Sequence, residues 1–295
     1  MRIAYFGLPL AALLLLEDGH DLEFAVVSRS DGVGLRRLVR RLGSDRVYLR
    51  AETQLEPLAE RVQSAAVDLV VSWFWTTKLP LAVVDAARQG GIGVHPSLLP
   101  SHRGPDPYFA AIDGGDRVTG VTVHRISEEY DTGAILASEP MIIDGRWNAW
   151  QLARRLDRPS LRLLRAVVSR IATGERITEV AQDEQFATWA PSPSTSDCAL
   201  VWSWSSARIL RRIRALAPAP GAYTEIHGKI LTLLEAELAP SFPRALEAGE
   251  AAVTAEGALV RTGDTAIRLL EGECEGTRLD RHALAGFVAR GGDLG

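Results

Sequence analysis

Residues 2–27, RIAYFGLPLAALLLLEDGHDLEFAVV, contain the pattern that decides the fold. A β-prone run from Arg2 to Phe6 leads into an apolar segment of helical length, and a second β-prone run covers residues 22–27. Pro9 stands just inside the expected start of the helix and Gly19 just past its end, where these two residues are favoured. The order strand, helix, strand is the unit from which parallel sheets are built.

The alternation of helices and strands continues along the chain. Helical patterns cover residues 34–43, 54–65, 81–88 and 148–174, and strand-like runs cover residues 67–72, 92–95, 119–126 and 136–143. Continuous apolar strands of this kind are buried on both faces, so we expect a Rossmann-like α/β fold with a parallel-rich sheet between helices. Gly7-Leu8-Pro9 does not supply a GxGxxG dinucleotide fingerprint, which argues against a nicotinamide or flavin enzyme.

The composition of the chain changes near Trp189, where a Pro/Ser-rich stretch begins. Beyond it, a helix over residues 206–216 is followed by short β-like runs with turns at residues 227–229 and 262–264. Closely spaced short strands are typical of a small barrel. We therefore expect an α/β domain over residues 1–188, a linker over residues 189–199 and a small β-barrel domain over residues 200–295.

Composition argues against several classes of protein. No apolar run approaches the roughly 20 residues that span a bilayer, and residues 9–16 lack the flanks of a signal peptide. We therefore expect a cytoplasmic protein without a membrane partner. Cys198 and Cys274 have no neighbours at ligand spacing, which indicates neither a disulfide framework nor a metal site. The net charge of -4 gives no general attraction to phosphate backbones.

His95 is the first candidate catalytic residue. It closes a short predicted strand and precedes the proline-bracketed loop 96–100. Ligands of open α/β sheets bind at the carboxyl edge of the strands, and histidine can act there as an acid or a base. Taken alone, such a histidine is more often a satisfied polar residue than a catalyst.

Three blocks in a fixed order extend this site: HPSLLPSHRG at residues 95–104, TGVTVH at 119–124 and EYDTGAIL at 129–136. Together they closely resemble the formyltransferases that use 10-formyltetrahydrofolate. Residues 201–203, 213–216, 218–223 and 228–231 resemble the carboxyl-terminal domain of the methionyl-tRNA members, which is an OB-like β-barrel. The resemblance covers nearly the whole chain.

The resemblance implies transfer of a formyl group to an amine through a tetrahedral intermediate. In the family an Asn-x-His pair and a distant Asp carry this chemistry. The histidine and the aspartate map to His95 and Asp131, whereas the asparagine position is Gly93. Loss of one oxyanion donor costs about 100- to 1,000-fold in rate. Three hypotheses stay open: another group donates, a different acyl or one-carbon group or nucleophile is used, or the chain is a non-catalytic folate-binding protein.

The resemblance also implies contacts to the co-substrate and the acceptor, and no metal. The residues expected to bind the folate are Trp75, Thr77, Leu79, Ser97, Leu98, Tyr130, Thr132 and Gly133. Those expected to bind the acceptor are Pro100, Arg103 and Gly104. Arg103 is equally compatible with a surface role, and Trp73 and Phe74 with a place in the core.

The acceptor is the least determined part of the prediction. The methionyl-tRNA enzymes carry a basic insertion after the second strand, and residues 28–34, SRSDGVG, are much shorter. Arg36, Arg37, Arg40 and Arg41 compensate only in part, and otherwise form the solvated face of a helix. Because amino-sugar formyltransferases share the two-domain plan, we favour a small or nucleotide-linked amine over initiator tRNA.

Overall fold

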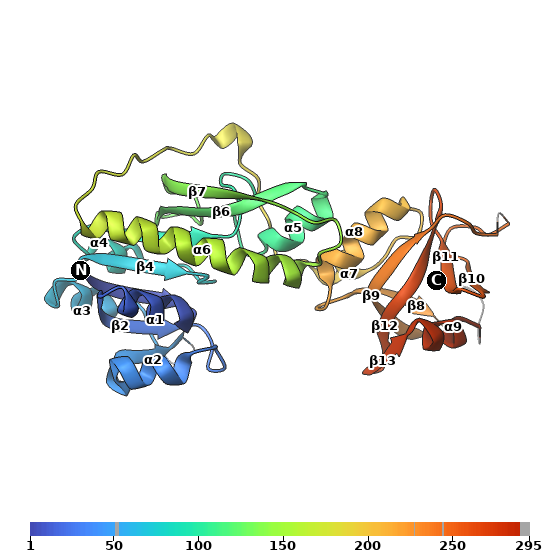
Figure 1. Cartoon of the computed structure of the whole chain (residues 1–295), viewed down its shortest axis with the longest axis horizontal. Helices are drawn as coiled ribbons and strands as arrows, with labels where there is room; N and C mark the ends of the chain where they lie inside the picture. The colour runs from blue at the N-terminus through green and yellow to red at the C-terminus, as the bar shows by residue number, and fades with distance from the viewer. Residues whose placement is uncertain (51–52, 227, 244, 290–295) are drawn as a thin grey trace. The chain divides into compact units, whose positions relative to one another are not determined.

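The computed structural model describes residues 1–50, 53–226, 228–243 and 245–289 (Figure 1). Contacts divide the chain into two compact units. Unit 1 consists of Met1–Pro105, Val118–Ile142 and Arg155–Ala190. Unit 2 consists of Asp106–Arg117, Ile143–Arg154 and Pro191–Gly295.

Unit 1 is built around a sheet in the order β3-β2-β1-β4-β5-β6-β7. Its strands are β1 (Arg2–Gly7), β2 (Asp21–Val27), β3 (Val47–Leu49), β4 (Leu69–Trp73), β5 (Gly91–His95), β6 (Val118–Arg125) and β7 (Ile135–Ile142). The first five pair in parallel, and β6 pairs antiparallel with both β5 and β7. The parallel-rich, Rossmann-like sheet is thereby confirmed.

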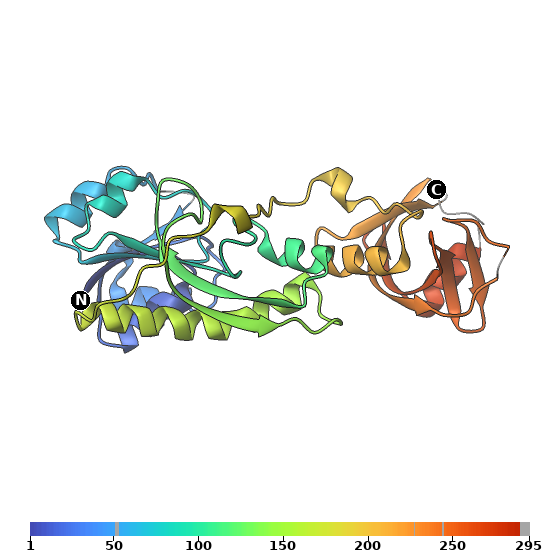
Figure 2. The same ribbon diagram turned by 90° about the horizontal axis from the view of Figure 1, so that it is seen from above.

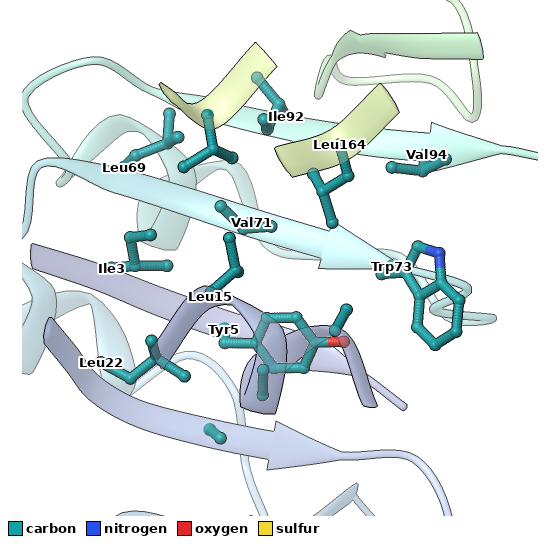
Figure 3. Packing of buried hydrophobic residues seen from close by; sticks show 14 of the residues in the cluster. Ile3, Tyr5, Leu15, Leu22, Leu69, Val71, Trp73, Ile92, Val94 and Leu164 are labelled. Carbon is teal, nitrogen blue, oxygen red and sulfur yellow. The ribbon is translucent and has the colours of Figure 1, made fainter. Parts of the chain in front are cut away.

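Helices cover both faces of this sheet. They are α1 (Pro9–Glu17), α2 (Leu35–Leu42), α3 (Leu58–Ser64), α4 (Leu81–Asp85) and α6 (Ala149–Ala172), of which α6 runs alongside the sheet (Figures 1 and 2). Leu15 of α1 and Leu164 of α6 pack in one buried cluster with Val71 (Figure 3). Val70 faces the opposite side, where it packs in a cluster with Val83 of α4.

Two helices of unit 1 are shorter than the sequence pattern predicts. The helix expected over residues 54–65 starts at Leu58, because Pro57 disfavours a helical backbone at Glu56. The helix expected over residues 81–88 ends at Asp85. Short 3-10 turns, η1 (Ser44–Arg46) and η3 (Glu184–Phe186), lie outside the predicted elements.

Unit 2 contains a second, antiparallel sheet in the order β10-β11-β12-β9-β8, with β13 paired to β12. Its strands are β8 (Ala222–Ile226), β9 (Lys229–Ala239), β10 (Ala251–Thr254), β11 (Gly257–Arg261), β12 (Ala266–Cys274) and β13 (Thr277–Asp280). The helices are α5 (Pro107–Gly114), α7 (Thr195–Cys198), α8 (Ser206–Leu216) and α9 (Arg281–Ala289). A parallel-rich domain followed by a small antiparallel one agrees with the expected fold class.

The core of unit 2 joins α8 and α9 to the sheet. Ile213 of α8, Leu231 and Leu269 of the sheet, and Leu284 of α9 belong to one buried cluster. His227, part of the turn predicted at residues 227–229, lies outside the described residues. Among the helices that the structure describes, none is long and apolar enough to cross a membrane.

Candidate active site

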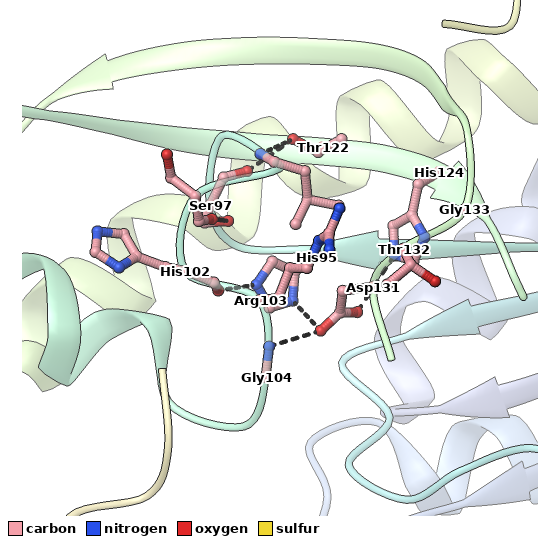
Figure 4. Close-up of polar contacts among 12 residues, drawn as sticks. His95, Ser97, His102, Arg103, Gly104, Thr122, His124, Asp131, Thr132 and Gly133 are labelled. Atoms are coloured by element: carbon pink, nitrogen blue, oxygen red, sulfur yellow. Dashed lines mark hydrogen bonds and ion pairs between the residues drawn. The ribbon is translucent and has the colours of Figure 1, made fainter. Parts of the chain in front are cut away.

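His95 ends β5 and is almost fully buried. Its Nε2 lies 2.7 Å from the carbonyl oxygen of His102, whose backbone is left-handed with φ of 57°. Because a carbonyl oxygen only accepts, Nε2 must carry the hydrogen of this bond. The other ring nitrogen, Nδ1, lies 3.4 Å from Oδ2 of Asp131 (Figure 4).

Asp131 is held from two sides. Its Oδ2 accepts the Gly104 N–H at 2.9 Å, and its backbone oxygen accepts from Nε2 of Gln182 at 2.7 Å. The residue has φ of 58°, a left-handed conformation that Asp tolerates better than most residues. These contacts fix the carboxyl group beside His95 (Figure 4).

A second imidazole, His124 of β6, faces the same carboxyl group. Its Nε2 lies 3.5 Å from Oδ1 of Asp131, and its Nδ1 lies 2.8 Å from the backbone oxygen of Arg125. His124 pairs with Gly93 across the antiparallel β5–β6 ladder. His124 was not among the predicted site residues, although Thr122 and His124 alternate as polar residues along an otherwise apolar strand, which is the signal that marks one face.

Burial and the nearby carboxyl group have opposite effects on the protonation of the two rings. Burial lowers the pKa of His95 and that of His124, and Asp131 opposes the shift at both rings. Each ring donates one N–H to a backbone carbonyl, so its other nitrogen is free to accept. The cluster therefore presents two ring nitrogens that can accept a proton beside one carboxyl group, which makes it suitable for acid–base chemistry.

The loop after His95 is anchored by Thr122 of β6. The Thr122 hydroxyl donates to the Ser97 backbone oxygen at 2.7 Å and accepts the Leu99 N–H at 3.1 Å. The buried Ser97 hydroxyl donates to the Ser101 carbonyl at 2.6 Å. Leu98 packs against Gly120, where an added Cβ would stand 2.5 Å from its Cδ2. The predicted folate contacts Ser97 and Leu98 are therefore firmly placed beside His95.

The Arg103 side chain is buried in an internal network. Its Nη2 donates to Oε1 of Gln182 and to Oε1 of Glu184, both at 2.8 Å. Gln182 in turn bonds the backbone oxygens of Asp131 and Gly133. Gly104 thus contacts Asp131 directly, and Arg103 is linked to it through Gln182. A contact of Arg103, Gly104 or Pro100 with an acceptor stays a prediction.

The remaining predicted folate residues come from two segments. Trp75 and Thr77 follow β4, where the Arg50 guanidinium lies 5.9 Å from the Trp75 ring and its Nε donates to Thr77 Oγ1. Trp75 Nε1 is buried without a hydrogen-bond partner in the part of the chain that the structure describes. Leu79 is buried in the cluster beside α4, and Trp73 lies in the core, where its Nε1 donates to Ser160 Oγ.

The second segment surrounds Asp131. Tyr130 is 42% exposed, so its ring is available to a ligand, whereas Thr132 Oγ1 lies 2.9 Å from Ser127 Oγ. Gly133 admits no side chain, because an added Cβ would stand 1.9 Å from the Arg125 backbone oxygen. The structure therefore brings residues 130–133 to His95, and the binding roles of this segment stay predictions.

Two family models match successive parts of the chain. The family model described as "Formyl transferase" matches residues 23–168, and the one described as "Formyl transferase, C-terminal domain" matches residues 194–281. The chain is 30% identical over 287 residues to methionyl-tRNA formyltransferase of Halalkalibacterium halodurans, which covers 92% of this chain and 89% of the relative. It is also 34% identical over 282 residues to methionyl-tRNA formyltransferase of Acidiphilium cryptum. That alignment covers 91% of this chain and 90% of the relative.

Solved structures share the fold at lower identity. WlaRD, a sugar 3N-formyl transferase solved in the presence of dTDP and 5-N-formyl-THF, has a TM-score of 0.68 at 14% identity, covering 94% of this chain and 98% of that one. HypX of Aquifex aeolicus in complex with tetrahydrofolic acid has a TM-score of 0.67 at 20% identity, covering 95% of this chain and 46% of that one. This chain therefore spans about half the length of HypX.

Proposed function

Because the chain belongs to the formyltransferase family, we propose that it transfers the formyl group of 10-formyltetrahydrofolate to a small or nucleotide-linked amine. The observation that carries the proposal is the convergence of two buried imidazoles, His95 and His124, on the carboxyl group of Asp131. Such a cluster supplies a proton acceptor, which formyl transfer needs when the attacking amine loses its proton.

The chemistry requires one proton to change place. The lone pair of the acceptor nitrogen forms a bond to the formyl carbon while the carbonyl π pair moves to oxygen. Collapse of that adduct breaks the bond from carbon to the folate nitrogen, which keeps the electron pair. One proton leaves the acceptor nitrogen and one joins the folate nitrogen, so the reaction is balanced. His95, oriented by Asp131 and by the His102 carbonyl, is placed to take up and return that proton.

Folate as the donor agrees with the residues around the cluster. Trp75 offers a buried indole N–H for which the described residues provide no partner, and Tyr130 offers an exposed ring. An aromatic pterin is a suitable partner for both kinds of group. Two of the solved proteins with this fold were crystallised with a tetrahydrofolate compound.

A small acceptor agrees with the charge distribution near the start of the chain. Arg29 forms an ion pair with Asp31 at 2.9 Å, and Arg37 of α2 forms one with Glu17 at 2.7 Å. These ion pairs reduce the positive charge with which this part of the chain could bind phosphate groups. Initiator tRNA is the second candidate, because relatives at 30–34% identity are methionyl-tRNA formyltransferases.

The proposal is tested by incubating the purified protein with 10-formyltetrahydrofolate and either a panel of amines, including nucleotide-linked amino sugars, or charged initiator tRNA. Formylated product and released tetrahydrofolate are then measured by mass spectrometry. We expect an amine to be formylated, and His95→Ala and Asp131→Ala to lower kcat by about 100- to 10,000-fold. His20→Ala, outside the cluster, is the control. Binding of folate with no transfer to any acceptor would instead support a non-catalytic folate-binding protein.

A further inference from the structure

We propose that Trp189 determines the specificity for the acceptor, by stacking its exposed indole on the sugar ring that carries the reacting amine. This inference rests on the proposed function and deepens it, because it selects amines borne on a sugar ring among the small and nucleotide-linked amines. Trp189 belongs to unit 1, together with His95 and Asp131, and lies on the segment that follows α6, residues 173–190.

The backbone around Trp189 is held against the loop that follows β5. The Arg103 N–H donates to the Thr188 carbonyl at 2.9 Å, and the Ala190 N–H donates to the Arg103 carbonyl at 2.7 Å. The Thr188 hydroxyl also accepts the His102 N–H at 2.7 Å. Because these bonds lie on both sides of Trp189, its backbone has one fixed position before any ligand binds, which lowers the cost of binding.

The indole ring of Trp189 lies against Gly104. A Cβ added at Gly104 would stand 3.0 Å from Cε2, Cζ2 and Cη2 of the ring, and φ of Gly104 is 107°, so glycine is required there for two reasons. Gly104 also donates its N–H to Oδ2 of Asp131 at 2.9 Å (Figure 4). The ring edge therefore lies within about 9 Å of the carboxyl group, a bound set by these two contacts and two covalent bonds.

Much of the indole remains open to solvent. Trp189 is 55% exposed, although one edge of its ring is covered by Gly104. Exposed aromatic residues are common on protein surfaces, so the location of this ring carries the inference rather than its exposure alone. A ligand that covers the indole removes apolar surface from water, which is favourable.

The short distance to the reaction centre decides which part of the acceptor meets the indole. The attacking nitrogen has to reach His95, so Trp189 contacts the group that bears the amine or the group next to it. In a nucleotide-linked amino sugar that group is the sugar, because a ribose and two phosphates separate it from the base. The C–H face of a sugar ring is apolar, and the indole offers it a flat apolar surface.

A fixed carboxylate on the same segment suits the hydroxyl groups of a sugar. Glu184 accepts from Arg103 through two bonds, from Nη1 to Oε2 at 2.9 Å and from Nη2 to Oε1 at 2.8 Å. These bonds hold the pKa of Glu184 below its usual value, and its side chain is 71% exposed. Its oxygens therefore keep lone pairs for hydroxyl donors. Since the Arg103 backbone pairs with Trp189, one residue positions both the carboxylate and the indole.

The test measures steady-state kinetics of the wild type, Trp189→Ala, Trp189→Leu and Trp189→Phe with a panel of amino sugars linked to nucleoside diphosphates. We expect Trp189→Ala and Trp189→Leu to raise KM for the best amino sugar by about 10- to 100-fold, because neither side chain offers a flat face. Trp189→Phe should keep that KM within about fivefold of wild type, because phenylalanine retains an aromatic face. In all three variants kcat and KM for 10-formyltetrahydrofolate should change less than about threefold.

Phe186→Ala, which removes another exposed aromatic ring from the same segment, is the matched control and should leave KM for the amino sugar unchanged. Circular dichroism and folate binding check each protein, and Trp189→Leu with Trp189→Phe decides the question if Trp189→Ala does not fold. A KM for the amino sugar within about threefold of wild type in the variants without an aromatic ring would overturn this inference alone. Formylation confined to amines without a ring or to initiator tRNA would do the same. A wild type that binds folate but transfers nothing would overturn the proposed function as well.

Discussion

His95 and His124 make the stability of the protein depend on pH. Burial lowers the pKa of both rings, with Asp131 opposing, so the folded state favours the neutral forms. A histidine of the unfolded chain titrates near about 6.5. As the pH falls below that value, the unfolded chain binds protons that the folded protein resists. The free energy of unfolding should therefore fall with pH, by at most about 1.4 kcal/mol per pH unit for each ring.

Urea unfolding at pH 7.5 and pH 5.5 measures this dependence. His95→Gln and His124→Gln should each flatten it, because a glutamine side chain takes up no proton in this range. His282→Gln, which changes an exposed histidine of α9, is the matched control. A pH dependence that is the same in wild type and in both cluster variants would contradict the prediction.

Gln182 supports Asp131 although it lies far along the chain. Its Nε2 donates to the backbone oxygens of Asp131 and Gly133, both at 2.7 Å, and its Oε1 accepts from Arg103. Gln182→Ala should lower the free energy of unfolding by about 1–3 kcal/mol, because these groups lose their partner. It should lower kcat more than it raises KM for the folate, since the carboxyl group of Asp131 loses a support.

Denaturant unfolding and steady-state kinetics check the Gln182 prediction. Gln185→Ala, on the exposed turn η3, is the control, because the side chain lies at the surface. If Gln182→Ala and Gln185→Ala had equal kcat, Gln182 would have no part in positioning Asp131.

The strand β6 connects the sheet to the catalytic loop through Thr122. Thr122→Val keeps the shape of the side chain but removes the partner of both the Ser97 carbonyl and the Leu99 N–H. We expect a loss of about 2–4 kcal/mol in the free energy of unfolding, because two buried polar groups are left unpaired. KM for the folate should rise, since Ser97 and Leu98 are the predicted contacts. Thr119→Val, buried on the same strand, should cost less.

The elements that the sequence predicted best are those with strong local signals. The bounds of α8, residues 206–216, agree with the prediction because Ser205 caps the helix by accepting the Arg208 N–H and Pro218 follows its end. The three-residue strand β3 was missed because its side chains are only partly buried and show no alternation. The helix α5 was missed too, although Asp106 followed by Pro107 is an N-terminal signal.

The candidate site could be predicted from the sequence only in part, because local signals mark some of its residues and not others. His95 is marked by local sequence, since it ends a strand and precedes a proline-rich loop. The sequence showed Gly93 only as the position of a missing donor. Its contact with His124 depends on the strand register, which pairs these two residues of the antiparallel strands β5 and β6. Position along the chain alone gives no such pairing. Gln182 was equally hidden, because its contacts with Asp131 join residues distant in sequence.

The charge of the whole chain helps to decide between a small amine and tRNA as the acceptor. The net charge is -4, and Arg37 and Arg41 of the basic helix α2 both contact Glu17. A protein that neutralises several phosphates loses about 10³- to 10⁵-fold in affinity between roughly 50 and 200 mM salt. If the acceptor is a small amine, binding of initiator tRNA should be weak and change less than about tenfold over that range.

Filter binding or fluorescence anisotropy with labelled initiator tRNA measures that dependence, alongside kcat/KM for the best small amine at each salt concentration. The charge reversal Arg36→Glu/Arg40→Glu on α2 should leave kcat/KM for a small amine unchanged, because neither residue belongs to the His95 cluster. A nucleotide-linked amine carries few phosphates, so its response to salt should also be shallow. A steep salt dependence of tRNA binding that this charge reversal reduces would instead identify tRNA as the acceptor, with α2 compensating for the short connector at residues 28–34.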